Sequence, residues 1–187
     1  ASLPAYVRYI LHEKDEGLHY KYKGLNLLRV EGYSDASLGN RPGTGDSQFG
    51  FDVGIEGCCA TEFKVGWTLY AYTSTFETEL HSLSEMTRSI VYTRDFLLEL
   101  GGPDGIHQSG PSVGKCDNMS AVRHGNDRIS SSKARSIRLR DFYCTQMREA
   151  GAVRFEWVAG NDNRADMYTK QLPADTLEKH SRAARDA

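Results

Sequence analysis

The sequence predicts an α/β domain in which helices flank a mixed, five-stranded sheet. Three strand-like stretches follow one another with short turns between them, which favours an antiparallel meander. Downstream, helical and strand-like patterns alternate, as they do where strands run parallel. The chain has 187 residues, 39% hydrophobic and 26% charged, which suffices for one buried core and one domain.

The first three strands are predicted from alternating side chains. The stretch LLRVEGYSD alternates up to Asp35, and SQFGFDVGI carries an apolar residue at every second position, as in a half-buried strand. Residues 58–75, rich in Thr, Tyr, Trp and Val, predict a third strand with a bend at Gly66.

The segments that follow change to helical periodicity. Between residues 78 and 100, apolar side chains recur every three or four positions, and Gly-Gly-Pro ends the pattern. Residues 132–150 predict a second long helix and NRADMYTKQL a shorter one, while SVGKCD and VRFEWV predict the remaining two strands. Residues 174–187 predict a charged, loosely held tail.

Composition restricts the possible partners and the cellular location. A net charge of −2 gives no strong overall attraction to nucleic acid, so binding a polyanion requires a local patch or metal ions. No apolar run reaches membrane-spanning length and no signal sequence opens the chain, so we expect an intracellular protein without membrane contact. The cysteines lack metal-ligand spacing and are expected as reduced thiols: Cys58, Cys59, Cys116 and Cys144.

Four acidic residues fall at or near the ends of predicted elements: Asp35, Glu79, Asp117 and Asp166. Taken singly, each fits a solvated or helix-capping carboxylate. If the first and fourth strands are neighbours, however, Asp35 and Asp117 end side by side, and two helices can bring Glu79 and Asp166 to the same edge. Such a cluster requires cations, and its oxygen-only ligands favour Mg²⁺ or Mn²⁺ over zinc.

The stretches GYSDASLG, TSTFETELHSL, KCDNMSAV and NDNRADMYTKQLP resemble the ribonuclease H domain of copia-type (Pseudoviridae-like) LTR retrotransposon Pol polyproteins. The opening YVRYILHEKDEGLHYKY resembles the segment that joins the reverse transcriptase to that domain. The resemblance implies a ribonuclease H-like fold over residues 25–173. Residues 1–24 are then the tail of the preceding reverse transcriptase or connection region, and residues 174–187 the charged C-terminal tail.

The resemblance also implies an activity. The domain is expected to be a two-metal-ion endoribonuclease, a phosphodiester hydrolase that cleaves the RNA strand of RNA–DNA hybrids during reverse transcription. The family's catalytic and metal-binding acids carry over onto Asp35, Glu79, Asp117 and Asp166. Asp35 is expected to bridge two Mg²⁺ ions, which Mn²⁺ can replace. The implied partners are the hybrid and the upstream reverse transcriptase domain, in the cytoplasm or a virus-like particle.

Nucleic-acid contacts are expected in the basic run after the third acid. Either these side chains form a solvated helix face, or they contact the hybrid backbone together with Asn118: Arg123, Arg128, Lys133, Arg135 and Arg138. Three aromatic residues upstream are expected to pack in the core rather than to contact the duplex: Trp67, Tyr70 and Tyr72.

Several positions depart from the family pattern. Ser136 replaces the family's histidine, Gln171 replaces the proline of its TKPL-like motif, and KVGWT retains only Lys64 of its lysine-rich hairpin. Two alternatives to an active hybrid nuclease therefore stay open. One is a catalytically inactive ribonuclease H-like module that serves as a scaffold or tether in a polyprotein, and the other is a DNA nuclease of the same superfamily, such as an integrase or resolvase.

Overall fold

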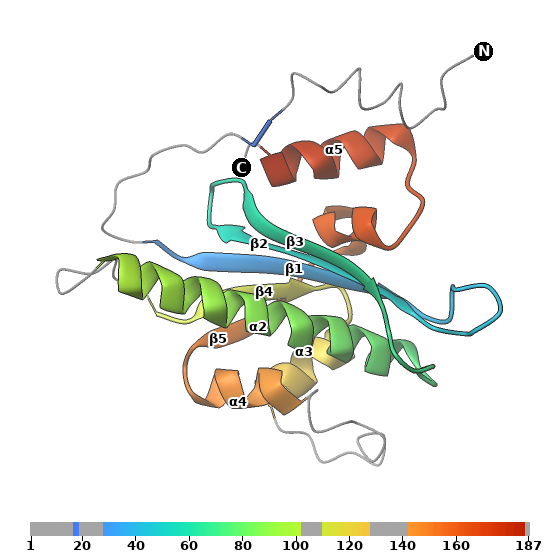
Figure 1. Ribbon diagram of the computed structural model, residues 1–187, viewed down its shortest axis with the longest axis horizontal. Coiled ribbons are helices and arrows are strands. Elements are labelled where there is room, and N and C mark those ends of the chain that lie inside the picture. The colour runs from blue at the N-terminus through green and yellow to red at the C-terminus, as the bar shows by residue number, and fades with distance from the viewer. Residues whose placement is uncertain (1–16, 19–27, 102–109, 128–141, 186–187) are drawn as a thin grey trace.

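The computed structural model describes residues 17–18, 28–101, 110–127 and 142–185. Within these residues, five strands form one sheet in the order β3-β2-β1-β4-β5 (Figure 1). The first three strands are antiparallel neighbours, whereas β4 pairs in parallel with β1 and β5 in parallel with β4. The mixed sheet expected from the sequence is confirmed. The strands are β1 (Val30–Ser37), β2 (Gln48–Ile55), β3 (Ala60–Trp67), β4 (Ser112–Cys116) and β5 (Val153–Trp157).

Helices cover both faces of this sheet (Figure 1). On one side lie α2 (Thr75–Gly101), α3 (Met119–Asn126) and α4 (Tyr143–Glu149). On the other side lie the short 3₁₀ helix η5 (Arg164–Tyr168) and helix α5 (Ala174–Arg185), with η4 (Gly160–Asp162) preceding them in the chain. Among the described residues, no helix combines the length and apolar character that crossing a membrane requires.

The hydrophobic core lies between α2 and the sheet. Leu80, Leu83, Met86 and Ile90 follow one another at helical spacing and are fully buried. They join Phe51 and other inward-facing strand residues in one apolar cluster. Burying a side chain of this kind contributes about 1.5–3 kcal/mol, so this stripe fixes α2 on the sheet.

A buried ion pair helps to hold the elements that cover the second face of the sheet. Arg164 of η5 donates from Nε to Oδ1 of Asp52 on β2 at 2.8 Å, and both side chains are buried. The guanidinium lies 4.2 Å above the ring of Tyr33 and donates to the carbonyl of Ala183 in α5 at 3.3 Å. Because η5 and α5 cover this face, β2 is buried along nearly its whole length, not half-buried as its alternation predicts.

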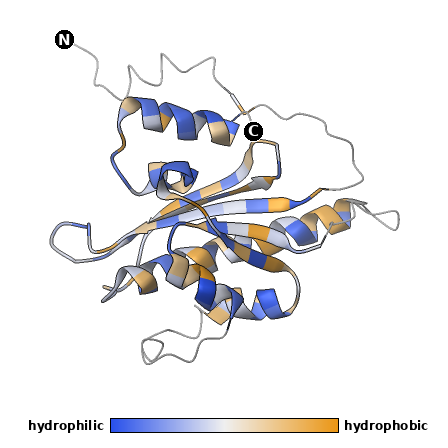
Figure 2. Ribbon diagram, turned by 180° about the vertical axis from the view of Figure 1, so that it is seen from behind, coloured by the Kyte–Doolittle hydropathy of each residue, from blue (hydrophilic) through white to orange (hydrophobic). Residues whose placement is uncertain are grey.

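Other segments also differ from expectation. The third strand ends at Trp67, and α3, an eight-residue helix, was not predicted. Residues 174–185 form α5 instead of a loose tail, because two side chains of this helix, His180 and Ala184, are buried. The rest of the helix is mostly hydrophilic (Figure 2).

The structure describes only part of the second predicted long helix and of the predicted domain boundaries. The start of the second predicted helix lies outside the described residues, as does nearly all of the opening segment. The domain boundaries at residues 24 and 173 therefore stay predictions.

Candidate active site

Two of the predicted acids meet because β1 and β4 are parallel neighbours. Their register pairs Ser34 with Cys116, so Asp35 and Asp117 occupy the next step at the same edge of the sheet. Asp35 is fully buried, whereas Asp117 is partly exposed. The expectation that these two carboxylates end side by side is confirmed by this geometry.

Asp166 reaches the same edge because η5 packs closely on the strands. Asn163 caps η5 by accepting a hydrogen bond from the amide of Ala165 at 3.3 Å, and its Nδ2 donates to the carbonyl of Ser34 at 3.1 Å. Gly50 lies opposite Asp35 in β2, and a side chain there would collide with Cβ of Tyr168. The absence of a Cβ at this position lets η5 approach the sheet.

One oxygen from each of three carboxylates, Asp35, Asp117 and Asp166, therefore falls within 4.8 Å of the others. They come from β1, from the residue after β4 and from η5. Ser82 of α2 supports the arrangement, since its hydroxyl donates to the carbonyls of Asp35 at 2.9 Å and Gly50 at 3.2 Å.

Glu79 is contributed by the first turns of α2. Ser74 caps this helix by accepting from the amide of Glu77 at 3.3 Å, and the Glu77 carboxylate accepts from the amide of Thr73 at 3.1 Å. Glu77 therefore takes part in capping the start of α2. Glu79, one half-turn further on, forms a second close group with Asp117 and the thiol of Cys116. All four predicted acids lie at one edge, and Asp117 belongs to both groups.

Burial makes this cluster electrostatically unfavourable without a cation. It raises the pKa of Asp35 to about 6, against the opposing effects of Thr169 and Lys170. It also raises the pKa of Asp117, and burial together with repulsion from Asp35 and Asp117 raises that of Glu79 well above its usual range. Carboxylate oxygens are the ligands that Mg²⁺ and Mn²⁺ prefer, so these residues fit a divalent-ion site.

Two neighbours of the acids were missed as site residues from the sequence. The hydroxyl of Thr169 donates to Oδ2 of Asp35, and Nζ of Lys170 lies 3.0 Å from Oδ1 of Asp35 and 2.8 Å from Oδ1 of Asp166. Lys170 also lies 4.0 Å from Oδ2 of Asp117. The spacing of four residues between Asp166 and Lys170 is that of a helical ion pair and could have indicated the contact.

We expect Asp35 to make the stability of the metal-free protein depend on pH. Its pKa is higher in the folded state, about 6 against 3.8, so the folded state holds the proton more tightly. The contribution of the Asp35 proton to the free energy of unfolding is fully present below about pH 4 and is lost as the pH rises through about 6. Unfolding free energies in EDTA should show wild type losing stability relative to Asp35→Asn over this range. A constant difference would contradict the raised pKa.

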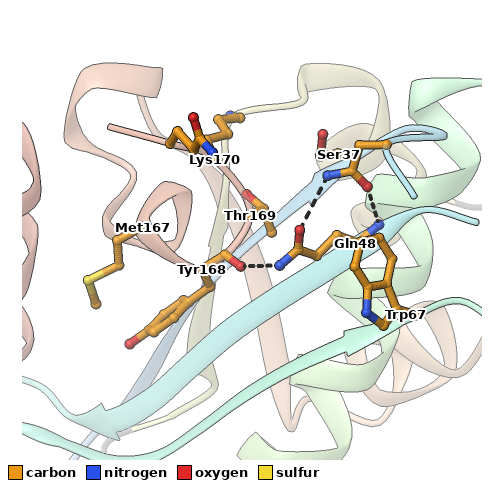
Figure 3. Close-up of a pocket in the computed structure, with 9 residues that line it drawn as sticks. Ser37, Gln48, Trp67, Met167, Tyr168, Thr169 and Lys170 are labelled. Atoms are coloured by element: carbon orange, nitrogen blue, oxygen red, sulfur yellow. Dashed lines mark hydrogen bonds between the residues drawn. The ribbon is translucent and has the colours of Figure 1, made fainter. Parts of the chain in front are cut away.

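A polar groove of about 580 Å³ lies beside the acids (Figure 3). Gln48 forms part of its lining and donates to the carbonyl of Tyr168 at 2.9 Å, while Lys170 lies between the groove and the carboxylates. Trp67 borders it with 42% of its surface exposed, and the guanidinium of Arg41 lies 5.4 Å from its ring. Trp67 and Tyr70 are exposed, so the expectation of core packing is wrong for both. Trp67 is the last residue of β3, which is an edge strand, and Tyr70 lies beyond the end of that strand.

The expected nucleic-acid contacts are described only in part. Asn118 is the N-cap of α3 and accepts from the amides of Ser120 and Ala121, and Arg123 is exposed on the same helix. His124, within the basic run, is buried against Phe76. The other four residues lie outside the described part of the chain: Arg128, Lys133, Arg135 and Arg138.

Solved structures that superpose on this chain include ribonuclease H domains. RNase H1 from the archaeon Halobacterium salinarum NRC-1 superposes with a TM-score of 0.53 at 14% identity, covering 81% of this chain and 98% of that one. The N-terminal RNase H domain of a Mycobacterium tuberculosis protein, solved as a fusion with maltose binding protein, gives 0.52 at 15% identity, covering 84% and 99%. The chain has the ribonuclease H fold.

LC11-RNase H1, solved in complex with an RNA/DNA hybrid, shares this ribonuclease H fold with a TM-score of 0.51 at 14% identity, covering 75% of this chain and 93% of that one. No protein-family model matches the chain.

The sequence relatives are retrovirus-related Pol polyproteins of plant transposons. The chain is 25% identical over 149 residues to that of TNT 1-94 from Nicotiana tabacum and 26% identical over 185 residues to that of RE2 from Arabidopsis thaliana. These matches cover 80% and 97% of this chain, which spans 11% and 12% of the two polyproteins. The expected resemblance to the ribonuclease H domain of a copia-type Pol polyprotein is confirmed.

Proposed function

We propose that this chain is a metal-dependent endoribonuclease that cleaves the RNA strand of RNA–DNA hybrids during retrotransposon reverse transcription. The observation that carries the proposal is the meeting of Asp35, Asp117 and Asp166 within 4.8 Å, with Glu79 adjoining through Asp117, on a ribonuclease H fold. Four carboxylates at one edge, three of them buried, serve no evident structural purpose, and their mutual repulsion opposes folding.

Asp35, Glu79, Asp117 and Asp166 would hold the divalent ions, Mg²⁺ or Mn²⁺. When bound, such ions supply the positive charge that activates water and stabilises the leaving oxygen. The chain's own residues keep the carboxylates in place. Ser82 fixes the backbone of Asp35, the Thr169 hydroxyl orients its side chain, and Asn163 ties the helix of Asp166 to β1.

The groove beside the acids is the proposed path of one strand of the hybrid. Trp67 offers an exposed ring to the sugars, Arg41 and Lys170 offer charge to the phosphates, and Gln48 and Tyr168 form a polar surface between them. The residues expected from the sequence remain proposed contacts with the hybrid: Asn118, Arg123, Arg128, Lys133, Arg135 and Arg138. Residues 1–24 would link the domain to an upstream reverse transcriptase.

Strand selectivity tests the function. The protein is incubated with Mg²⁺ and a hybrid labelled on both strands, beside duplex DNA and duplex RNA of the same sequence. We expect cutting of the RNA strand of the hybrid alone. Cutting of duplex DNA would instead indicate a DNA nuclease, and a folded protein that cuts nothing would indicate a scaffold or tether module.

Trp67→Ala is expected to weaken binding of the hybrid about fivefold, or about 1 kcal/mol, because exposed tryptophans often dominate contact energies. Binding is measured by fluorescence anisotropy in EDTA, where no cleavage occurs. Tyr92→Ala is the matched control, since Tyr92 is also exposed but lies on α2, outside the groove. Equal affinities for the two variants would remove Trp67 from the proposed path.

A further inference from the structure

Lys170 places a positive charge inside the acid cluster. Its Nζ donates to Oδ1 of Asp35 at 3.0 Å and to Oδ1 of Asp166 at 2.8 Å, and it lies 4.0 Å from Oδ2 of Asp117. One ammonium group therefore faces all three carboxylates of the group formed by Asp35, Asp117 and Asp166. Thr169, directly before it, satisfies the other oxygen of Asp35.

This position excludes a divalent ion from the same oxygens. Mg²⁺ binds carboxylate oxygens at about 2.0–2.1 Å. An ammonium group that is hydrogen-bonded to Oδ1 of both Asp35 and Asp166 would be within a few ångströms of such an ion, and the two cations would repel each other. The ion and Nζ therefore compete for Asp35 and Asp166.

The structure also provides space for the displaced side chain. Lys170 is 38% exposed and lines the groove that Gln48 and Trp67 border (Figure 3). A lysine stem can rotate its head group by several ångströms without a change of backbone, so Nζ can leave the acids for the groove.

We propose that Lys170 is a resident counter-cation of the acid cluster, which stabilises the metal-free domain and competes with divalent ions for Asp35 and Asp166. The inference rests on the proposed function, because it concerns the same acids as a metal site. Metal loading then requires Lys170 to leave the carboxylates, so Lys170 sets the metal concentration at which the site fills.

A purely structural role for Lys170 predicts a different result. If the side chain only ties η5 to β1, its removal lowers stability equally with and without metal and leaves metal affinity unchanged. Competition instead predicts opposite effects, in which the metal-free protein loses stability while metal affinity rises. The two roles are thus separated by the sign of the change in affinity.

The test is a Mn²⁺ titration of thermal unfolding for wild type, Lys170→Gln and Lys170→Arg. We expect Lys170→Gln to lower the unfolding temperature in EDTA and to reduce the half-saturating Mn²⁺ concentration about tenfold, since it removes charge-assisted hydrogen bonds. Lys170→Arg keeps the charge and should stay near wild type. Lys179→Gln is the matched control, because Lys179 pairs with Asp162 at 2.7 Å on the exposed surface. An unchanged or higher half-saturating concentration in folded Lys170→Gln overturns the proposal.

Cleavage of the hybrid, measured on the same samples, separates this proposal from the function on which it rests. If wild type cleaves but Lys170→Gln binds Mn²⁺ no more tightly, the function stands and the competition is refuted. If no sample cleaves but Lys170→Gln binds Mn²⁺ more tightly, the competition stands and the nuclease is refuted. If neither protein responds to Mn²⁺, both are refuted.

Discussion

Asp35→Asn is expected to reduce cleavage of the RNA strand by about 1000-fold, the loss typical of removing a group that stabilises developing charge. Asparagine has the shape of aspartate but lacks its negative charge, so the variant cannot hold a divalent ion as wild type would. The fold should persist, because Asp35 is fully buried and its charged form is disfavoured by burial. The rate is measured under single-turnover conditions with saturating Mg²⁺.

The matched control for this loss is Asp175→Asn. Asp175 is exposed in the first turn of α5 and lies outside both acid groups, so the same chemical change there should leave the rate unchanged. A folded Asp35→Asn protein that cleaves within tenfold of wild type would refute the assignment of Asp35.

Arg164→Met is expected to destabilise the domain by about 3–5 kcal/mol, since it leaves a buried carboxylate without its partner. Asp52 has no solvent exposure, and Arg164 donates to its Oδ1 from both Nε and Nη2. The same arginine contacts Tyr33 on β1 and the backbone of α5, so its loss also loosens η5, which carries Asp166. Urea unfolding at neutral pH measures the change.

Two comparisons test the cause of this loss. Arg29 pairs with Glu56 at 2.6 Å, but both side chains are substantially exposed, so Arg29→Met should cost no more than about 1 kcal/mol. The double variant Arg164→Met with Asp52→Leu should recover much of the stability, because it removes the orphaned charge. If Arg164→Met costs no more than Arg29→Met, the buried pair is not what holds the second face.

The sheet and the meeting of two acids could be predicted because they follow from local patterns. Strand alternation located β1 and β2, and helical spacing located the buried face of α2. Once β1 and β4 are neighbours, Asp35 and Asp117 must fall at the same edge, since parallel strands end together. The capping residues before Glu79 also fix its place in the helix.

The contacts made by η5 could not be predicted in the same way. A five-residue 3₁₀ helix carries too little periodicity to reveal its buried side, and its docking depends on Gly50 and on the Arg164–Asp52 pair. Lys170 and Thr169 were consequently not predicted as site residues. Trp67 was misassigned because its pattern fits a covered strand, whereas the face of β3 that it occupies is left open at the edge of the sheet.

Whether the four acids act as one cation site is tested most directly by counting bound Mn²⁺. Free Mn²⁺ is followed by electron paramagnetic resonance as the ion is added to wild type and to Asp35→Asn. We predict saturable binding to wild type that is lost, or weakened at least tenfold, in Asp35→Asn. Equal binding by the two folded proteins, or no binding by wild type, would contradict a metal site built on Asp35.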